Sequence, residues 1–446
     1  FVHYYINMAL SPRGEIPGVF LIAGLKNRLL KDTMQIMLRL TSILLTLLFL
    51  GSCGSGDRSP RTWTILVYMD GDNNLDLAAL ADMEEMKAVG SSDHVKIVVQ
   101  LDLRGVTTKR YLVEKGSTKL ISDLGELDMA APQTITDFLV WSKDAYPADR
   151  TVFIIWNHGN GWDQGDGPSV LSSPRRSILY DEDNNGVNAP FLSNFKVRNA
   201  ITNSGAKIDI FGLDASIMGT IEALYEFRGL APIIITSQEV GESHGWDYKT
   251  ILSRLEADPG MGTEDLATVV VGSYRDFFEG TFYPQNPGKE KGYTISALRT
   301  NYMGQIAQEA DSLAVGLMSL MGDQVTKADT LALIRNARQG AQAIDYYVQS
   351  HVYVDLVDIE RLLGKGTSIS QLISDATIAE YHGSARLNAH GVSIVFFKMP
   401  EAIALTYDPN YKNHDPQTLT GNAGEFINLF RWDEFLRKYY SYEGFI

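Results

Sequence analysis

The chain has 446 residues, of which 45% are hydrophobic and 21% charged, and its 54 acidic and 39 basic side chains give a formal net charge of −15. This composition excludes disordered and collagen-like proteins. The acidic balance argues against nucleic acid as the main partner, because phosphate-binding surfaces are normally basic. The length predicts one large α/β domain with additions, or two domains.

The N-terminal part predicts an export signal. Residues 40–50 form an apolar run after Arg39, and this run is shorter than the roughly 20 residues of a membrane-spanning helix. The run leads into Leu-Gly-Ser-Cys, which resembles a bacterial lipobox that ends at Cys53. An ordinary signal peptide with an incidental cysteine is the alternative. We expect residues 34–53 to be a lipoprotein signal, and residues 1–33 to precede the natural start of the protein.

This signal predicts export and a lipid anchor at Cys53 that holds the protein to a bacterial membrane, on the periplasmic side or at the cell surface. Cys53 is also the only cysteine of the chain. A single cysteine excludes an intramolecular disulfide, a multi-cysteine zinc site and a thiol nucleophile in the folded body. Residues 54–61 are rich in glycine and serine and are expected to form a flexible tether.

Apolar runs typical of strands alternate with helical patterns after the tether. Strands are predicted at residues 63–69, 95–101, 151–156, 208–213 and 233–236. Helices are predicted over residues 134–143 and on two apolar stripes, one formed by Leu80, Met83, Met86 and Val89 and one by Ile217, Ile221 and Leu224. The alternation predicts an α/β fold, a three-layer αβα sandwich with a mostly parallel sheet. The run at 63–69 is typical of a strand buried on both faces.

The C-terminal part predicts helical additions to this core. Residues 303–345 have a helical pattern, residues 391–397 predict a late strand in the same sheet, and residues 432–440 predict a closing amphipathic helix. We therefore expect a sheet-bearing core over residues 62–300. Residues 301–446 are expected to add a helical region and the strand that completes the fold.

Chemistry is expected at the carboxyl ends of the parallel strands, where open α/β sheets bind ligands. One strand runs into Asn-His158-Gly159-Asn-Gly-Trp162, and another runs into Asp214-Ala-Ser216. A histidine in a glycine-rich turn can act as a base beside free backbone N–H groups, and a hydroxyl after a strand can act as a nucleophile. From the spacing alone, a structural histidine and a helix-capping serine are the more common outcomes.

These residues resemble the motifs of the clostripain family of cysteine peptidases, which have a caspase-like fold. Residues 67–75 resemble the opening strand and turn, residues 158–162 the catalytic-histidine motif, and residues 214–218 the nucleophile motif. Later similarities lie at residues 237–246, 391–394 and 432–440, so the resemblance extends over most of the chain after the tether. It implies a caspase-like sheet and a peptide cleft with His158 as the base.

The sequence departs from the family at the nucleophile, because Ser216 stands where the family has cysteine. A thiol has a pKa of about 8.5 and ionises readily beside an imidazole, whereas serine enzymes generally need a base oriented by a carboxylate. One hypothesis is a pseudo-peptidase that binds Arg/Lys-containing peptides without cutting them. The second is a working hydrolase in which Ser216 attacks, His158 is the base and the Gly159 N–H helps to hold the oxyanion.

Two further alternatives stay open. The first is that Ser216 is an engineered replacement of a natural cysteine. The second is that the protein is a surface scaffold that binds no peptide. The resemblance places Asp214 in the pocket that receives Arg or Lys, while a turn aspartate bonded to local backbone is the alternative. Trp162 and Trp246 wall the groove or pack in the core, and His244 is expected in a surface loop.

Two more features concern the segment between the histidine and nucleophile motifs. Asp181 and Asp183 fit the first half of a calcium loop, but Leu192 occupies the position of the bidentate glutamate, so an EF-hand is excluded. No cofactor is required, and calcium at Asp181 and Asp183, or at Asp70 and Asp72, is a hypothesis that the family resemblance implies, beside an acidic hairpin. The resemblance places Arg175 and Arg176 in the region where family members often cut themselves, while an exposed basic pair in a loop is the alternative. With Ser216 present, we expect no self-cleavage.

Overall fold

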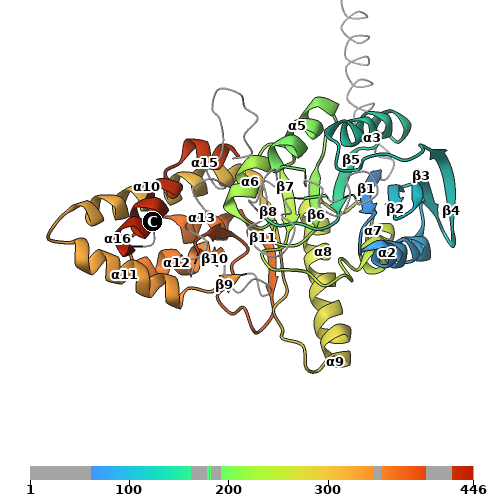
Figure 1. The fold of residues 1–446 in the computed structure, drawn as a ribbon. Helices are drawn as coiled ribbons and strands as arrows, with labels where there is room; N and C mark the ends of the chain where they lie inside the picture. The colour runs from blue at the N-terminus through green and yellow to red at the C-terminus, as the bar shows by residue number, and fades with distance from the viewer. Residues whose placement is uncertain are drawn as a thin grey trace, which may run out of the picture. The chain divides into compact units, whose positions relative to one another are not determined.

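A nine-stranded mixed sheet, in the order β11-β8-β7-β6-β5-β1-β2-β3-β4, is the centre of the computed structural model (Figure 1). The structure describes residues 62–161, 178–179, 181, 192–344, 353–397 and 424–444. These residues belong to Pro60–Ile446, the second of two units into which the chain divides. The predicted lipoprotein signal, Cys53 and the tether at 54–61 lie outside the described residues.

The five central strands are parallel, as predicted. They are β2 (Val95–Leu103), β1 (Trp63–Gly71), β5 (Arg150–Trp156), β6 (Ile210–Asp214) and β7 (Ile233–Thr236). The register pairs Met69 of β1 with Trp156 of β5, and Trp156 with Asp214 of β6. The carboxyl ends of three strands are thereby level, so the residues that follow them are brought to one edge of the sheet.

The outer strands are antiparallel, which makes the sheet mixed. They are β3 (Val106–Glu114) and β4 (Ser117–Asp123) on one side, and β8 (Thr294–Arg299) and β11 (Thr377–His382) on the other. None of these four strands is predicted by the apolar runs of the sequence. The predicted parallel sheet is thus its five-stranded centre, and antiparallel strands extend it on both edges.

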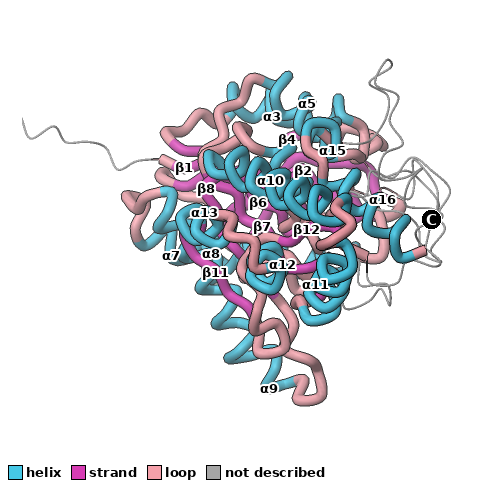
Figure 2. The backbone as a smooth tube through the Cα atoms, turned by 90° about the vertical axis from the view of Figure 1, so that its left-hand side faces the viewer, coloured by secondary structure: helices cyan, strands magenta, loops and turns pink. Residues whose placement is uncertain are grey.

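Strand β1 is buried on both faces, as predicted, and its side chains alternate between two apolar cores. Trp63, Ile65, Val67 and Met69 join the core on one face, and Leu66 and Tyr68 join the core on the other. The first core is covered by α2 (Asp76–Val89), α7 (Tyr248–Ala257) and α8 (Thr263–Phe277). The second is covered by α3 (Pro132–Ala145), α5 (Asn194–Ser204) and α6 (Ile221–Phe227). This is the predicted αβα sandwich (Figures 1 and 2).

The stripe predicted for α2 is partly wrong. Met83 and Met86 are buried, but Leu80 is 45% exposed and the buried stripe continues through Ala79 instead. A spacing of three residues advances by less than the 3.6 residues of a helical turn, so a strict three-residue stripe drifts around the helix. Leu80 therefore lies on the solvent-facing side of α2.

The C-terminal additions are helical, as predicted. The helical pattern at 303–345 forms α10 (Met303–Gly322) and α11 (Lys327–Gly340), and the tail forms α16 (Trp432–Glu443). Further elements are α12 (Leu356–Leu363), α13 (Ile369–Ala376), α15 (Glu425–Leu429), α9 (Tyr283–Gln285), the π-helix η1 (Phe278–Phe282) and the 3₁₀ turn η2 (Thr300–Tyr302). Helix α10 packs against α6, α11 and α16, which joins the additions to the sheet-bearing core (Figure 1).

The late strand does not join the main sheet, so that prediction is wrong. Strand β12 (Ser393–Val395) pairs antiparallel with β10 (Tyr353–Asp355), which also pairs with β9 (Ala343–Ile344). The edge of the main sheet next to β8 is already occupied by β11. The Ser393 N–H instead donates to the carbonyl of Gly219, 2.8 Å away, and so ties β12 to the segment before α6.

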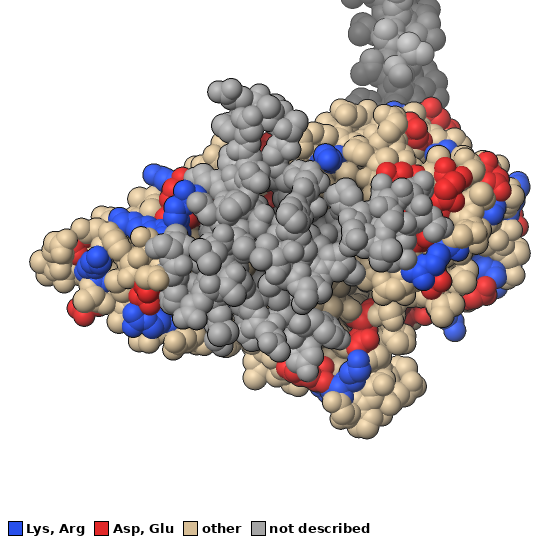
Figure 3. Space-filling view, viewed as in Figure 1, with Lys and Arg blue, Asp and Glu red and all other residues tan. Residues whose placement is uncertain are grey.

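Acidic and basic side chains are interspersed on the face seen in Figure 3. Among the described helices, none has the length and apolar character needed to cross a membrane.

Candidate functional site

A cavity of about 250 Å³ opens at the carboxyl ends of β5 and β6. The predicted residues His158, Asp214, Ser216 and Trp246 all line it, together with Asn157, Glu242 and Tyr274. His158 follows β5 and Ser216 follows β6, and the two meet here because Trp156 of β5 and Asp214 of β6 are register partners. The structure thus brings the predicted base, the predicted nucleophile and the predicted pocket acid to one place.

His158 is held by the turn that follows β1, a connection that the sequence does not reveal. Its Nε2 lies 2.8 Å from Oδ1 of Asn74. An amide oxygen only accepts hydrogen bonds, so Nε2 carries the proton and Nδ1 is the basic nitrogen. The His158 N–H also donates to Oδ1 of the preceding Asn157, which fixes the backbone at the start of the turn.

Asn157 is the anchor between the two turns. Its Nδ2 donates to the carbonyl oxygen of Asp70 at 3.0 Å and to the Asp70 carboxylate at 2.6 Å. Asp70 is fully buried, and burial, followed by the charges of Asp181 and Asp102, raises its pKa well above the usual value. The turn after β1 is therefore built on a buried carboxyl group, and it carries Asn74 to the imidazole.

Ser216 follows β6 in a turn, and its helix begins later than predicted. Ile217 has a φ of 61°, in the left-handed region, so the predicted helical stripe through Ile217 is wrong. Helix α6 begins at Ile221 after Thr220, whose hydroxyl accepts from the Ala223 N–H at 3.2 Å. Ser216 is accordingly not a helix cap. Its Oγ accepts a hydrogen bond from the Gly241 N–H at 3.1 Å.

Gly159 allows the two turns to come close together. A Cβ on Gly159 would lie 2.4 Å from the carbonyl oxygen of Ser216 and 2.9 Å from Cγ of Met218. Any side chain there would force the histidine turn and the Ser216 turn apart. The structure thus gives Gly159 a packing role, and its predicted role as an oxyanion donor stays a prediction.

Among the described residues, Asp214 is one of two acidic residues that line the cavity, beside Glu242. Its Oδ2 accepts from the Trp246 N–H at 3.2 Å and from the Tyr248 hydroxyl at 3.0 Å. Burial raises the pKa of Asp214 to about 7, against the lowering effect of these two hydrogen bonds. Gly245, with a φ of 53°, lets the backbone approach the carboxylate, because a Cβ there would lie 2.8 Å from Oδ2.

Trp246 is a wall of the cavity and is itself well packed. Its side chain is buried, and its ring lies over Gly212 of β6, where a Cβ would be 2.7 Å from the ring. Trp246 is therefore a core residue that also lines the cavity, and its role as a wall of a peptide groove stays a prediction. Trp162, the other predicted wall, lies outside the described residues.

The loop after β7 supplies the rim of the cavity. Glu242 lines the cavity and accepts from the Tyr293 hydroxyl and from Lys289. Burial acts to raise the pKa of Glu242, but the hydrogen bonds from Lys289 and Tyr293 outweigh burial and lower it. His244 is exposed, as expected for a surface loop, with its ring 5.4 Å from that of Phe282.

Asp181 lies away from this cavity. It is fully buried, and its Oδ2 accepts from the Met129 N–H at 2.8 Å. Asp183 and the basic pair Arg175 and Arg176 lie outside the described residues. In the part of the chain that the structure describes, no group of three or more His, Cys, Asp or Glu side chains is placed to hold a metal ion. Calcium binding therefore stays a prediction.

The mixed sheet, the helices on both of its faces and the turns after adjacent parallel strands define an α/β protein with a caspase-like fold. A family model described as the clostripain family matches residues 67–389. The chain belongs to the clostripain family.

The individual relatives share only low sequence identity with this chain. Clostripain from Hathewaya histolytica is 26% identical over 238 residues, which cover 46% of this chain and 44% of clostripain, so the match spans less than half of that relative. A secreted C11 cysteine protease from Bacteroides thetaiotaomicron, solved with an irreversible peptide inhibitor, is 19% identical with a TM-score of 0.58, and the match covers 79% of this chain and 97% of that one.

A second solved structure gives the same result for the fold. An inactive zymogen C11 protease from Parabacteroides distasonis is 19% identical with a TM-score of 0.57, over 79% of this chain and 98% of that one. At this identity the solved structures establish the fold alone.

Proposed function

We propose that this protein is a clostripain-family member that binds peptides through an Arg or Lys side chain and cleaves them slowly or not at all. The observation that carries the proposal is the Asp214 carboxylate in the same cavity of about 250 Å³ as Ser216 and His158. A basic side chain that reaches Asp214 would place its own backbone beside Ser216. The proposal therefore has two parts: Asp214 recognises the basic side chain, and Ser216 is a poor nucleophile for the peptide bond beside it.

The surroundings of Asp214 support recognition of a cation. Both hydrogen bonds to the carboxylate end on Oδ2, so Oδ1 is the oxygen available to a guanidinium or ammonium group. Trp246 and Tyr274 line the same cavity, and aromatic faces are favourable neighbours for the aliphatic stem and the charge of Arg and Lys. A bound cation favours the ionised form of Asp214, whose pKa lies near 7 in the free protein.

The surroundings of Ser216 support slow chemistry. A hydroxyl is far less acidic than a thiol, so its proton must leave during attack. The imidazole that would take this proton has an amide oxygen, Asn74 Oδ1, at 2.8 Å from Nε2. Serine enzymes use a carboxylate at this place, and its replacement by an amide lowers kcat by about 10⁴ in a serine protease.

The second candidate, a hydrolase that uses Ser216, is favoured by one observation. The Gly241 N–H already donates to Ser216 Oγ at 3.1 Å, and such a donor would stabilise negative charge on this oxygen. His158 lines the same cavity. Efficient hydrolysis of a basic peptide by the unmodified protein would favour this candidate over the first.

The proposed location is outside the cytoplasm. The predicted signal at residues 34–53 and the description of a solved relative as secreted both support export. Attachment of a lipid to Cys53 remains part of this proposal. Mass spectrometry of the protein taken from membranes of its host tests it, because a lipidated N-terminal cysteine adds a defined mass.

The recognition proposal is tested by fluorescence anisotropy with labelled peptides that end in Arg, Lys or norleucine and are otherwise identical. We expect binding of the Arg and Lys peptides, weak binding of the norleucine peptide, and intact peptides by mass spectrometry afterwards. Asp214→Asn should weaken binding of the basic peptides about tenfold or more, since it removes the charge of an ion pair. Equal binding of all three peptides would contradict recognition through Asp214.

A further inference from the structure

The segment Ser237–Gly241, which follows β7, contacts the Ser216 turn at several points. The Gly241 N–H donates to Ser216 Oγ at 3.1 Å, and the carbonyl of Glu239 accepts from the Ile217 N–H at 3.2 Å. The carbonyl of Ser237 accepts from the Gly219 N–H at 2.7 Å. The placement of the side chain at position 216 therefore depends on how this segment is held.

The turn needs such support because of its backbone. Ile217 is β-branched and has a φ of 61°, in the left-handed region, which is unfavourable for branched residues. Such a backbone conformation persists only where surrounding contacts impose it. The contact that meets the backbone of Ile217 is the hydrogen bond to Glu239. The segment Ser237–Gly241 is accordingly a support for a strained turn.

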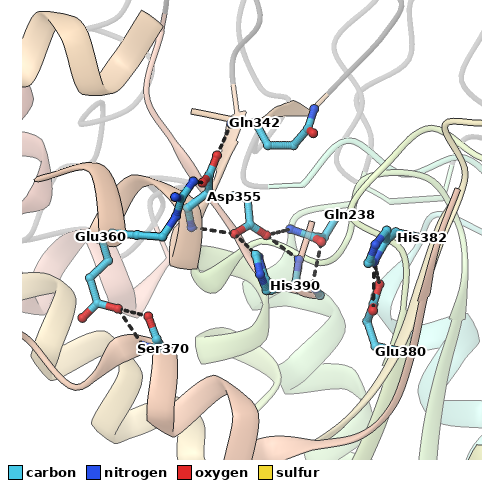
Figure 4. A network of polar contacts seen from close by, with 11 residues as sticks. Gln238, Gln342, Asp355, Glu360, Ser370, Glu380, His382 and His390 are labelled. Atoms are coloured by element: carbon cyan, nitrogen blue, oxygen red, sulfur yellow. Dashed lines mark hydrogen bonds and ion pairs between the residues drawn. The ribbon is translucent and has the colours of Figure 1, made fainter. Parts of the chain in front are cut away.

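Buried side chains fix this segment from the C-terminal part of the chain. Gln238 is fully buried, and its Nε2 donates to Asp355 at 3.1 Å while its Oε1 accepts from the Gly391 N–H at 2.7 Å. Figure 4 shows Asp355 between Gln238 and His390, whose Nδ1 lies 2.9 Å from Asp355 Oδ1. These contacts hold the segment at its second residue, two positions before Val240.

Glu239 is fixed by a buried ion pair. Arg386 Nε lies 2.7 Å from Glu239 Oε2, and both side chains are at most 8% exposed. The other oxygen of the same carboxylate, Oε1, accepts from the Val240 N–H at 3.0 Å. The carboxylate therefore connects Arg386 to the amide of Val240, one residue before the Gly241 amide that donates to Ser216.

Arg386 is well placed to act as a fixed point. Its Nη1 lies 2.8 Å from Glu290, and it packs against Gly292, where a Cβ would be 3.3 Å from Nη2. A guanidinium that is held by two carboxylates in a close-packed site has little freedom to move.

We propose that Arg386 is a positioning residue, whose ion pair with Glu239 holds the Gly241 N–H at hydrogen-bonding distance from the side chain at position 216. The proposal goes beyond peptide recognition and requires no peptide. A donor held at this place favours negative charge on the atom that it faces. The Arg386 ion pair thus determines how readily the group at position 216 ionises.

The test uses Ser216→Cys as a reporter, because the ionisation of a thiol is measured by the pH dependence of its alkylation. Iodoacetamide alkylation of the peptide that contains position 216 is followed by mass spectrometry, which separates it from Cys53. We expect Arg386→Gln in this background to raise the thiol pKa by about one unit, since the thiolate loses its hydrogen-bond donor. Arg386→Lys should restore most of the original pH profile.

The matched control is Arg198→Gln, which removes an arginine from a second ion pair with a buried glutamate, at 2.7 Å from Glu226. We expect it to lower stability without shifting the pH profile of alkylation. Glu239→Gln, which keeps the size of the side chain, tests the same pair if Arg386→Gln does not fold. An unchanged profile in the folded variant would overturn the proposal, as would an equal shift in Arg198→Gln.

Discussion

Asn74 Oδ1 lies 2.8 Å from Nε2 of His158, so the imidazole is oriented by an amide from the turn after β1. Such an amide fixes which ring nitrogen is protonated but contributes no negative charge. This is sufficient to orient a histidine beside a thiol, which ionises readily, and it is a poor support for a histidine that must deprotonate a hydroxyl. The Asn74–His158 pair therefore fits a site suited to a cysteine nucleophile, in which Ser216 takes the position of the cysteine.

Asn74→Ala tests the orienting role in the Ser216→Cys background. We expect kcat for a basic peptide to fall about tenfold to hundredfold, because a misplaced base costs rate, with KM nearly unchanged. Steady-state kinetics with an Arg-ended fluorogenic peptide measures both constants. A change confined to KM would show that Asn74 contributes to binding instead.

Gly159→Ala should disturb both turns. The added Cβ would lie 2.4 Å from the backbone oxygen of Ser216, which cannot move as a flexible side chain can. We expect a loss of about 2 kcal/mol in the free energy of unfolding, within the range of overpacked sites. Urea denaturation measures this loss.

Gly272→Ala is the matched control for that variant. Gly272 lies within α8, and a Cβ there would have nothing within 4 Å. The same substitution is therefore expected to stabilise the protein by about 0.5–1 kcal/mol, as alanine does inside a helix. Equal effects of the two substitutions would remove the argument for close approach at Gly159.

Peptide binding should depend on pH through Asp214. A cation binds the ionised carboxylate, and the pKa of Asp214 in the free protein is about 7. Affinity for an Arg-ended peptide should therefore be highest above pH 7 and fall by up to about tenfold for each unit below it. Asp214→Asn should remove this dependence, whereas Glu242→Gln should leave the inflection in place. Affinity that is constant between pH 5.5 and 8 would rule out Asp214 as the cation site.

Asp82 should make stability fall as the pH rises. Its Oδ2 accepts from Trp156 Nε1 at 2.7 Å, and burial, followed by the charge of Asp214, raises the pKa of Asp82 to about 9. A carboxyl group with a raised pKa in the folded state binds protons that the unfolded state releases, so the unfolding free energy decreases between the unfolded value near 4 and pH 9. Asp82→Asn should flatten this slope, which is at most about 1.4 kcal/mol per unit.

The comparison variant is Asp82→Ala. It leaves the buried Trp156 N–H without its acceptor, and we expect it to cost about 1–3 kcal/mol at pH 7. Urea denaturation at pH 6, 7.5 and 9 separates the two effects. Parallel pH profiles for Asp82→Asn and the unmodified protein would show that Asp82 does not titrate as argued.

The buried centre of the fold is predictable from the sequence, and its edges are not. Strands β1 and β5 are apolar on both faces, and such runs identify central parallel strands. Strand β4 is polar and half-exposed along its length, so no apolar run marks it. The strand at β12 has an apolar composition that also suits the main sheet, but β11 occupies the edge next to β8 and β12 pairs with β10.

The candidate site likewise has residues that the sequence predicts and residues that it does not. His158, Asp214, Ser216 and Trp246 lie beside strand ends or in loops near them, and the sheet register collects them in one cavity. Asn74 and Gly241 were not predicted, because their roles depend on how separate loops fold back onto the cavity. The left-handed backbone of Ile217 was also missed, since a branched residue in this conformation is imposed by tertiary contacts.

The central claim is that the cleft recognises a basic side chain while Ser216 cannot carry out efficient cleavage. The most direct measurement compares hydrolysis of Arg- and Lys-ended fluorogenic peptides by the unmodified protein and by Ser216→Cys, each with and without calcium. We predict no turnover by the unmodified protein and clear turnover after Ser216→Cys. Efficient hydrolysis by the unmodified protein, abolished by Ser216→Ala, would contradict the account and establish a peptidase that uses serine.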